Sequence, residues 1–81
     1  MTLYAREYEL NNGRFIPTNC RVKFNRDGSV NLEHIIKFGI NHCFLNDSAN
    51  ADDFEVIEKN DEYWIKPKDE PVFLFKITKD E

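Results

Sequence analysis

Turn-forming residues interrupt this chain at short intervals, and polar and apolar residues alternate between them. The dipeptide Asn12-Gly13 favours a two-residue β-hairpin turn, because both central residues of a type I′ turn need positive φ. Residues 25–28, Asn-Arg-Asp-Gly, are typical of a type I turn with Gly28 in a left-handed bulge position. Alternation between such turns is typical of antiparallel strands. The pattern predicts a mainly β fold, a single small antiparallel sheet of roughly five to six strands folded as a barrel or sandwich.

The first turn also predicts a register. A chain that folds back at Asn12-Gly13 pairs Leu10 with Phe15 and Tyr8 with Pro17, and these residues share one face. The apolar positions then change parity between Phe15 and Cys20. Because proline cannot donate to a strand ladder, we expect a bulge or sharp bend near Pro17-Thr18.

The second turn predicts a longer hairpin. With Gly28 in the bulge position, Phe24 lies opposite Val30, and Arg21 and Lys23 point outward. The same register continues with the pairs Val22–Leu32 and Cys20–His34.

Residues 29–40 fit two structures. As a strand, the even positions from Val30 to Ile40 form a nearly unbroken core-facing side, and this template matches more positions. As a helix, Asn31 would be the N-cap and Gly39 would end it. We expect the strand, and the alternative is an α+β fold with one short helix near residues 31–39.

The second half begins with a polar, acidic loop at residues 46–53. A turn at Asn60-Asp61 then sets Val56 opposite Ile65 and Ile57 opposite Trp64. After another turn at 67–71, residues 72–78 are apolar on both faces, with Phe73, Phe75 and Ile77 on one of them. Such a strand is usually central or covered, and at an exposed edge Val72–Thr78 would pair two copies into a homodimer.

The chain has 81 residues, which predicts a single domain over residues 1–81. No apolar run approaches the roughly 20 residues that a membrane-spanning helix needs. The two cysteines do not make a disulfide framework, and no secretory signal is recognisable. These features predict a soluble cytoplasmic protein with free thiols.

Charge is distributed unevenly along the chain, although the net charge is only −4. Residues 1–46 hold six basic and four acidic residues, including every arginine, whereas residues 47–81 hold five basic and eleven acidic ones. We expect the acidic half to dock on a basic protein surface, with charge steering the approach and Trp64 as the aromatic anchor. The expected contact residues are Asp52, Asp53, Glu55, Glu58, Asp61, Glu62 and Trp64.

No glycine-rich phosphate loop, nucleophile elbow or zinc-protease motif is present, which favours a non-enzymatic function without a cofactor. By size and charge, the chain is predicted to be a protein-binding inhibitor or adaptor. Inhibitors of host nucleic-acid enzymes carried by phages and mobile elements, such as anti-CRISPR and anti-restriction proteins, form a class of this kind. A second hypothesis is a small nucleic-acid-binding barrel that uses the basic residues Arg21, Lys23 and Arg26. The net negative charge disfavours nucleic acid.

Four side chains could in principle ligate a metal, namely Cys20, His34, His42 and Cys43. Their spacing lacks the paired knuckles of structural zinc sites. A thiolate nucleophile at Cys20 beside His34 would need exposure and a third, orienting group. We therefore expect Cys20 and His34 to be core side chains.

Overall fold

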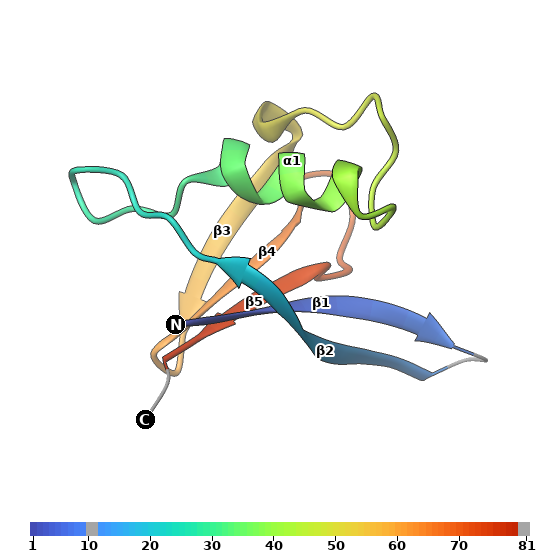
Figure 1. Ribbon diagram of the computed structural model, residues 1–81, viewed down its shortest axis with the longest axis horizontal. Helices are drawn as coiled ribbons and strands as arrows, with labels where there is room; N and C mark the ends of the chain where they lie inside the picture. The colour runs from blue at the N-terminus through green and yellow to red at the C-terminus, as the bar shows by residue number, and fades with distance from the viewer. Residues whose placement is uncertain (10–11, 80–81) are drawn as a thin grey trace.

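The computed structural model describes residues 1–9 and 12–79. Its order of elements begins with a hairpin, continues through a helix, and ends with three further strands (Figure 1). The elements are β1 (Thr2–Glu9), β2 (Asn12–Arg21), α1 (Leu32–Asn41), the 3₁₀ turn η1 (Ala51–Asp53), β3 (Phe54–Lys59), β4 (Glu62–Pro67) and β5 (Phe75–Thr78).

The strands form one sheet in the order β2-β1-β5-β4-β3, and every neighbouring pair is antiparallel. The expected mainly antiparallel β fold is therefore confirmed, together with the short helix of the alternative. The edge strands β2 and β3 do not pair with each other within the described residues, so the sheet is open there. Helix α1 and the chain that follows it lie on one side of the sheet (Figure 1).

The expectation of a strand over residues 29–40 is wrong, because residues 32–41 form α1. The Asn31 side chain caps the helix by accepting a hydrogen bond from the His34 backbone N–H at 3.2 Å. Ile35 and Ile36 are buried against the sheet together with Gly39, and this stripe has helical spacing. The even-numbered apolar residues matched a strand only because the helical stripe contains some of the same positions.

The turn at residues 25–28 is confirmed. Gly28 has φ of 87°, its N–H donates to the Asn25 carbonyl at 3.0 Å, and Phe24 pairs with Val30. The two pairs predicted beyond it do not form a ladder, because the helix starts at Leu32. Phe24 is also more exposed than a core residue, at 38%.

The predicted register of the first hairpin is wrong. Phe15 pairs with Arg6, and Gly13 pairs with Tyr8, so Asn12-Gly13 belongs to β2. Leu10, the predicted partner of Phe15, lies outside the described residues. The Arg6 guanidinium lies against Gly13 at the position that a Cβ would take, so a larger residue there would displace the end of this flexible side chain.

The irregularity beside Pro17 is confirmed, because the β1–β2 register shifts between Thr2 and Tyr4. At the shift, the Thr18 hydroxyl donates to the Leu3 carbonyl at 2.9 Å and accepts from the Cys20 N–H at 3.2 Å.

The β3–β4 hairpin has the predicted register, with Val56 opposite Ile65 and Ile57 opposite Trp64. Both turn residues have positive φ, 53° for Asn60 and 61° for Asp61.

The last strand is shorter than expected, since β5 covers only Phe75–Thr78. It lies between β1 and β4, as predicted for a strand that is apolar on both faces. Both of its backbone edges are therefore used, and a homodimer through Val72–Thr78 has no free edge of this strand to pair with. Phe73 precedes the strand and contacts Trp64, so it does not share a face with Phe75.

The sheet has two different faces. The face under α1, here called the covered face, contributes Leu3, Ala5, Ile65, Phe75 and Ile77 to the core, each with an exposure of 0%. Side chains alternate along a strand, so the residues between these point to the other face, here called the open face. No α-helix of the described chain lies on the open face (Figure 1). None of the described helices is long and apolar enough to cross a membrane.

Candidate functional site

Aromatic and cationic side chains meet on the open face. The register places Lys76 of β5 between Tyr4 of β1 and Trp64 of β4, and it places Arg6 opposite Phe15. All five side chains are half-buried. Residues from four strands therefore contribute to one continuous surface.

The rings of this surface contact one another edge to face. The Phe15 and Trp64 centroids are 5.4 Å apart at 88°, and those of Trp64 and Phe73 are 5.5 Å apart at 69°. Such pairs contribute about 0.5–1.5 kcal/mol beyond the burial of area. Trp64 is thus the centre of a small aromatic cluster.

Two lysines lie against the same indole ring. The Nζ of Lys59 is 4.7 Å from the Trp64 centroid, and the Nζ of Lys76 is 5.2 Å from it. The Lys76 ammonium also lies 5.0 Å from the Tyr4 ring and 5.2 Å from the Phe15 ring. We call these residues the cation–aromatic cluster: Tyr4, Arg6, Phe15, Lys59, Trp64, Phe73 and Lys76.

Lys59 and Lys76 are held differently from Lys66, whose ammonium pairs with the Glu55 carboxylate at 2.7 Å. Within residues 1–9 and 12–79, neither Lys59 nor Lys76 has a carboxylate at ion-pair distance. The buried Nε1–H of Trp64 also finds no acceptor in that part of the chain. Among the described residues, the ammonium groups of Lys59 and Lys76 therefore contact aromatic rings and no carboxylate, although the protein has an excess of carboxylates.

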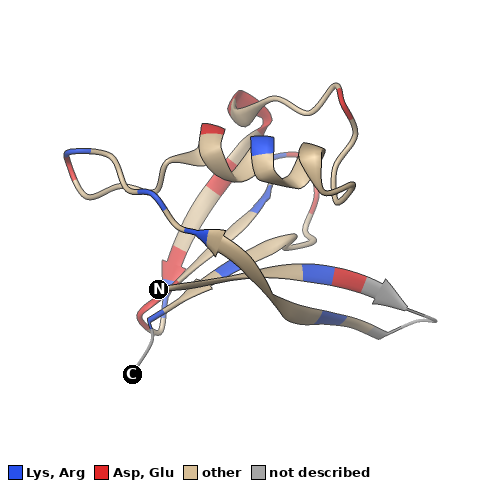
Figure 2. Ribbon diagram, viewed as in Figure 1, with Lys and Arg blue, Asp and Glu red and all other residues tan. Residues whose placement is uncertain are grey.

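The acidic residues predicted as a contact surface lie along β3 and at its ends. Asp52 and Asp53 are exposed in η1, Glu58 is exposed on the strand, and Asp61 lies in the turn that follows. Because strand side chains alternate, Glu58 lies on the face opposite to Glu55. Figure 2 shows these acidic bands along β3 and η1. We call this set the acidic edge: Asp52, Asp53, Glu55, Glu58, Asp61 and Glu62.

Trp64 was predicted to belong with these acidic residues. It shares the open face with Glu55 and Glu62, but the charged groups that contact its ring are the ammonium groups of Lys59 and Lys76. The sheet therefore brings Trp64 next to the acidic edge, and two ammonium groups contact its ring.

The predicted basic patch lies at the end of β2 and in the loop that follows it. Arg21 ends β2, Lys23 follows it, and Arg26 lies in the turn, and all three side chains are exposed. Figure 2 shows this basic segment extending from β2 into the loop that follows it. The loop reaches the covered face of β3 and β4, since the Phe24 and Tyr63 centroids are 6.0 Å apart. Gly28 also lines an open cavity together with Glu58, so the loop that carries Arg26 lies beside the acidic strand.

Cys20 and His34 do come together, although His34 is on α1 and not on a strand. The Cys20 Sγ is 3.4 Å from the His34 Nε2, and that nitrogen is 3.1 Å from the Arg21 carbonyl oxygen. A carbonyl can only accept, so Nε2 holds the proton and has no lone pair with which to take one from the thiol. Burial raises the pKa of the Cys20 thiol, against a weaker lowering by Lys23. The group therefore stays a thiol at neutral pH, the weaker nucleophile.

His42 and Cys43 lie at the other end of α1. The His42 ring stacks on Phe38 with centroids 4.1 Å apart, and its Nδ1–H donates to the Phe38 carbonyl at 3.0 Å. Cys43 is exposed and has φ of 62°. In the described part of the chain, no three metal-ligating side chains gather.

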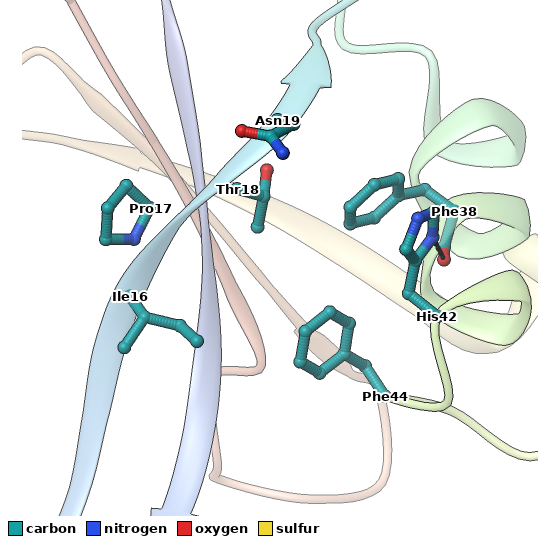
Figure 3. Close-up of a pocket in the computed structure, with 7 residues that line it drawn as sticks. All are labelled: Ile16, Pro17, Thr18, Asn19, Phe38, His42 and Phe44. Atoms are coloured by element: carbon teal, nitrogen blue, oxygen red, sulfur yellow. Dashed lines mark hydrogen bonds between the residues drawn. The ribbon is translucent and has the colours of Figure 1, made fainter.

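An open cavity of about 190 Å³ lies between the end of α1 and β2 (Figure 3). Phe38 and Phe44 face Ile16 across it, and His42 is the ionisable group of its lining. One imidazole without a second titratable group cannot provide a paired general acid and base. The lining residues are Ile16, Pro17, Thr18, Asn19, Phe38, His42 and Phe44.

Most of the cation–aromatic cluster was missed by the sequence reasoning. The alternation Tyr4-x-Arg6 and the apolar Phe15 were visible as strand positions. That they meet Trp64 and Lys76 follows from β1 pairing with β5, a contact between the two ends of the described chain. No residue pattern within β1 or within β5 predicts that pairing.

Comparison of the chain with protein-family models, with curated proteins and with solved structures finds no match.

Proposed function

We propose that this protein is a non-enzymatic inhibitor or adaptor that binds a protein partner through its acidic edge. The observation that carries the proposal is the strand order, which puts acidic residues from η1 to the β3–β4 turn on one sheet edge. The partner has a basic groove that accepts this edge, as nucleic-acid enzymes have. An inhibitor of the anti-CRISPR or anti-restriction kind would fit it.

Charge and shape support this function in different ways. Exposed carboxylates such as Asp52, Asp53 and Glu58 steer a diffusional encounter with a basic surface. Ile57 and Trp64 share the open face with Glu55 and Glu62 and are half-buried, so they supply apolar area close to these two carboxylates. Tryptophan is enriched among residues that dominate interface energy.

The test is binding to a panel of purified nucleic-acid enzymes, including CRISPR effector nucleases and restriction endonucleases. The variant Asp52→Lys/Glu58→Lys reverses the edge, and Glu7→Lys/Asp47→Lys makes the same change in net charge elsewhere. We expect the edge variant to slow association with a bound enzyme at least tenfold, with the control close to the parent protein. Added salt should slow association of the parent protein in the same direction.

Equal association rates for the two variants would contradict the proposal. So would the absence of binding to every enzyme of the panel at low salt.

A further inference from the structure

The cation–aromatic cluster has an electrostatic property that the acidic edge does not explain. Lys59 and Lys76 both lie within about 5 Å of the Trp64 centroid, so their ammonium groups are at most about 10 Å apart. Two like charges at such a separation repel each other weakly, and an anion that contacts both groups offsets the repulsion. No carboxylate of the described chain lies at ion-pair distance from either ammonium group, although the protein has more acidic than basic residues.

A third cation extends the same surface. The Arg6 guanidinium lies 5.9 Å from the Phe15 centroid, and the Lys76 ammonium lies 5.2 Å from that ring. The positive groups therefore follow one another across the open face, from β3 through β5 to β1. An occupant with several anionic groups at short intervals matches this arrangement better than a single anion.

The rings between the cations add a second requirement. Phe15, Trp64 and Phe73 are half-buried, so each residue keeps some exposure to solvent, on a face that no described helix covers. Unpaired nucleobases stack on such rings, whereas the bases of a duplex are already stacked on one another. We propose that the open face binds a single-stranded nucleic acid, with phosphates on Lys59, Lys76 and Arg6 and bases against Phe15 and Trp64.

Binding involves an exchange of partners at the rings. A cation–π contact at a partly exposed site contributes only about 0.5–1 kcal/mol, so a lysine can move from the ring to a phosphate. The ring area that it leaves becomes accessible to a base. The proposed surface contains none of the residues of the predicted patch, which are Arg21, Lys23 and Arg26.

Trp64 makes the site directly observable, because it is the only tryptophan. The experiment titrates the protein with a thymidine decanucleotide and follows tryptophan fluorescence, with a duplex of the same length and a decaglutamate peptide in parallel. We expect the single strand to quench the fluorescence, and the duplex and the peptide to bind at least tenfold more weakly. For about three phosphate contacts, the logarithm of affinity should fall with that of salt with a slope of about −2.

Two double variants test which lysines bind the single strand. Lys59→Gln/Lys76→Gln removes both ammonium groups at the indole, and Lys37→Gln/Lys68→Gln removes two exposed lysines elsewhere. We expect a loss of affinity of at least tenfold for the first and less than threefold for the second. Thermal unfolding of both variants checks that the fold is retained.

Several outcomes would overturn the inference. One is the absence of quenching at low salt, and another is equal binding of the decaglutamate peptide, which would identify an acidic protein segment as the occupant. Equal losses of affinity in the two lysine variants would show that binding depends on net charge and not on Lys59 and Lys76 in particular. The edge variant Asp52→Lys/Glu58→Lys should not weaken binding of the single strand, so this proposal and the protein-partner proposal can fail separately.

Discussion

The Lys76 ammonium lies 5.2 Å from the centroid of the Trp64 ring, directly across the ladder that joins β4 to β5. The same ring is contacted by Lys59 on one of its neighbouring strands and by Phe15 from the far edge of the sheet. Trp64 therefore connects the first hairpin to the second on the open face. Its packing should matter for stability as well as for binding.

Replacing Trp64 tests this packing. We expect Trp64→Ala to lower the free energy of unfolding by about 3 kcal/mol, because it removes the contacts of a large ring. Trp64→Phe keeps a ring and deletes the buried N–H that has no acceptor among the described residues, so it should cost less than about 1 kcal/mol. Urea unfolding followed by far-ultraviolet circular dichroism measures both. Equal losses in the two variants would show that the ring contacts contribute little.

The start of α1 depends on one side chain. Asn31→Ala removes the acceptor of the His34 N–H and should lower the free energy of unfolding by about 1 kcal/mol. Asn31→Asp keeps an acceptor at the cap and should remain within about 0.5 kcal/mol of the parent protein. The comparison is made by chemical unfolding at neutral pH. If Asn31→Ala were as stable as Asn31→Asp, the cap would not stabilise the helix.

The β3–β4 turn contains a residue whose replacement should stabilise the protein. Asp61 has φ of 61°, a conformation that glycine adopts without strain, and Asn-Gly is the preferred pair for such a turn. Asp61→Gly should raise the free energy of unfolding by up to about 1 kcal/mol. Asp61→Asn removes the same charge and keeps a side chain, so it separates backbone strain from charge. A gain in Asp61→Asn that equals the gain in Asp61→Gly would assign the effect to charge.

The buried thiol predicts how stability changes with pH. The pKa of Cys20 is raised by burial, so above the pKa of the unfolded thiol, about 8.5, the unfolded chain loses a proton that the folded chain keeps. The contribution of the Cys20 thiol to the free energy of unfolding is complete below that pH and is lost as pH rises further. We expect the stability of the parent protein to fall more between pH 8 and 10 than that of Cys20→Ala. Parallel curves for the two proteins would contradict this assignment.

The two thiols should also differ in reactivity. Cys43 is exposed, whereas Cys20 is half-buried and lies against His34. A thiol reagent used at pH 7.5 should modify Cys43 first, and Cys43→Ser should remove the fast phase. Mass spectrometry of partly labelled protein identifies the site. Faster labelling of Cys20 would contradict the burial of its thiol.

Local chemistry allowed part of this fold to be predicted. The register of β3 with β4 follows from the turn at Asn60-Asp61, and the Phe24–Val30 pair follows from the turn that ends at Gly28. In both cases the turn residues and the flanking apolar pattern favour the same pairing. The Asn12-Gly13 signal failed because both residues belong to β2, where they pair with Glu9 and Tyr8.

Tertiary context determined the remainder. Residues 32–41 match a strand by alternation, and the cap at Asn31 together with burial of Ile35 and Ile36 makes them a helix. The acidic edge was visible as a charge run, whereas the cation–aromatic cluster depends on β5 lying between β1 and β4. Neither segment alone contains a residue pattern that predicts pairing with a segment so distant in the sequence.

That central position of β5 has a consequence for how the chain folds. The hairpins β1–β2 and β3–β4 each close through short connections, but the other edge of β1 pairs with β5, where Thr2 lies opposite Thr78. Contacts of such long sequence separation slow folding, because the entropy of loop closure is lost before they form. On the ribosome, the backbone edges of β1 and β4 that face β5 would stay unpaired until β5 emerges and joins the two hairpins. Synthesis of the last strand is therefore the step that makes the sheet continuous.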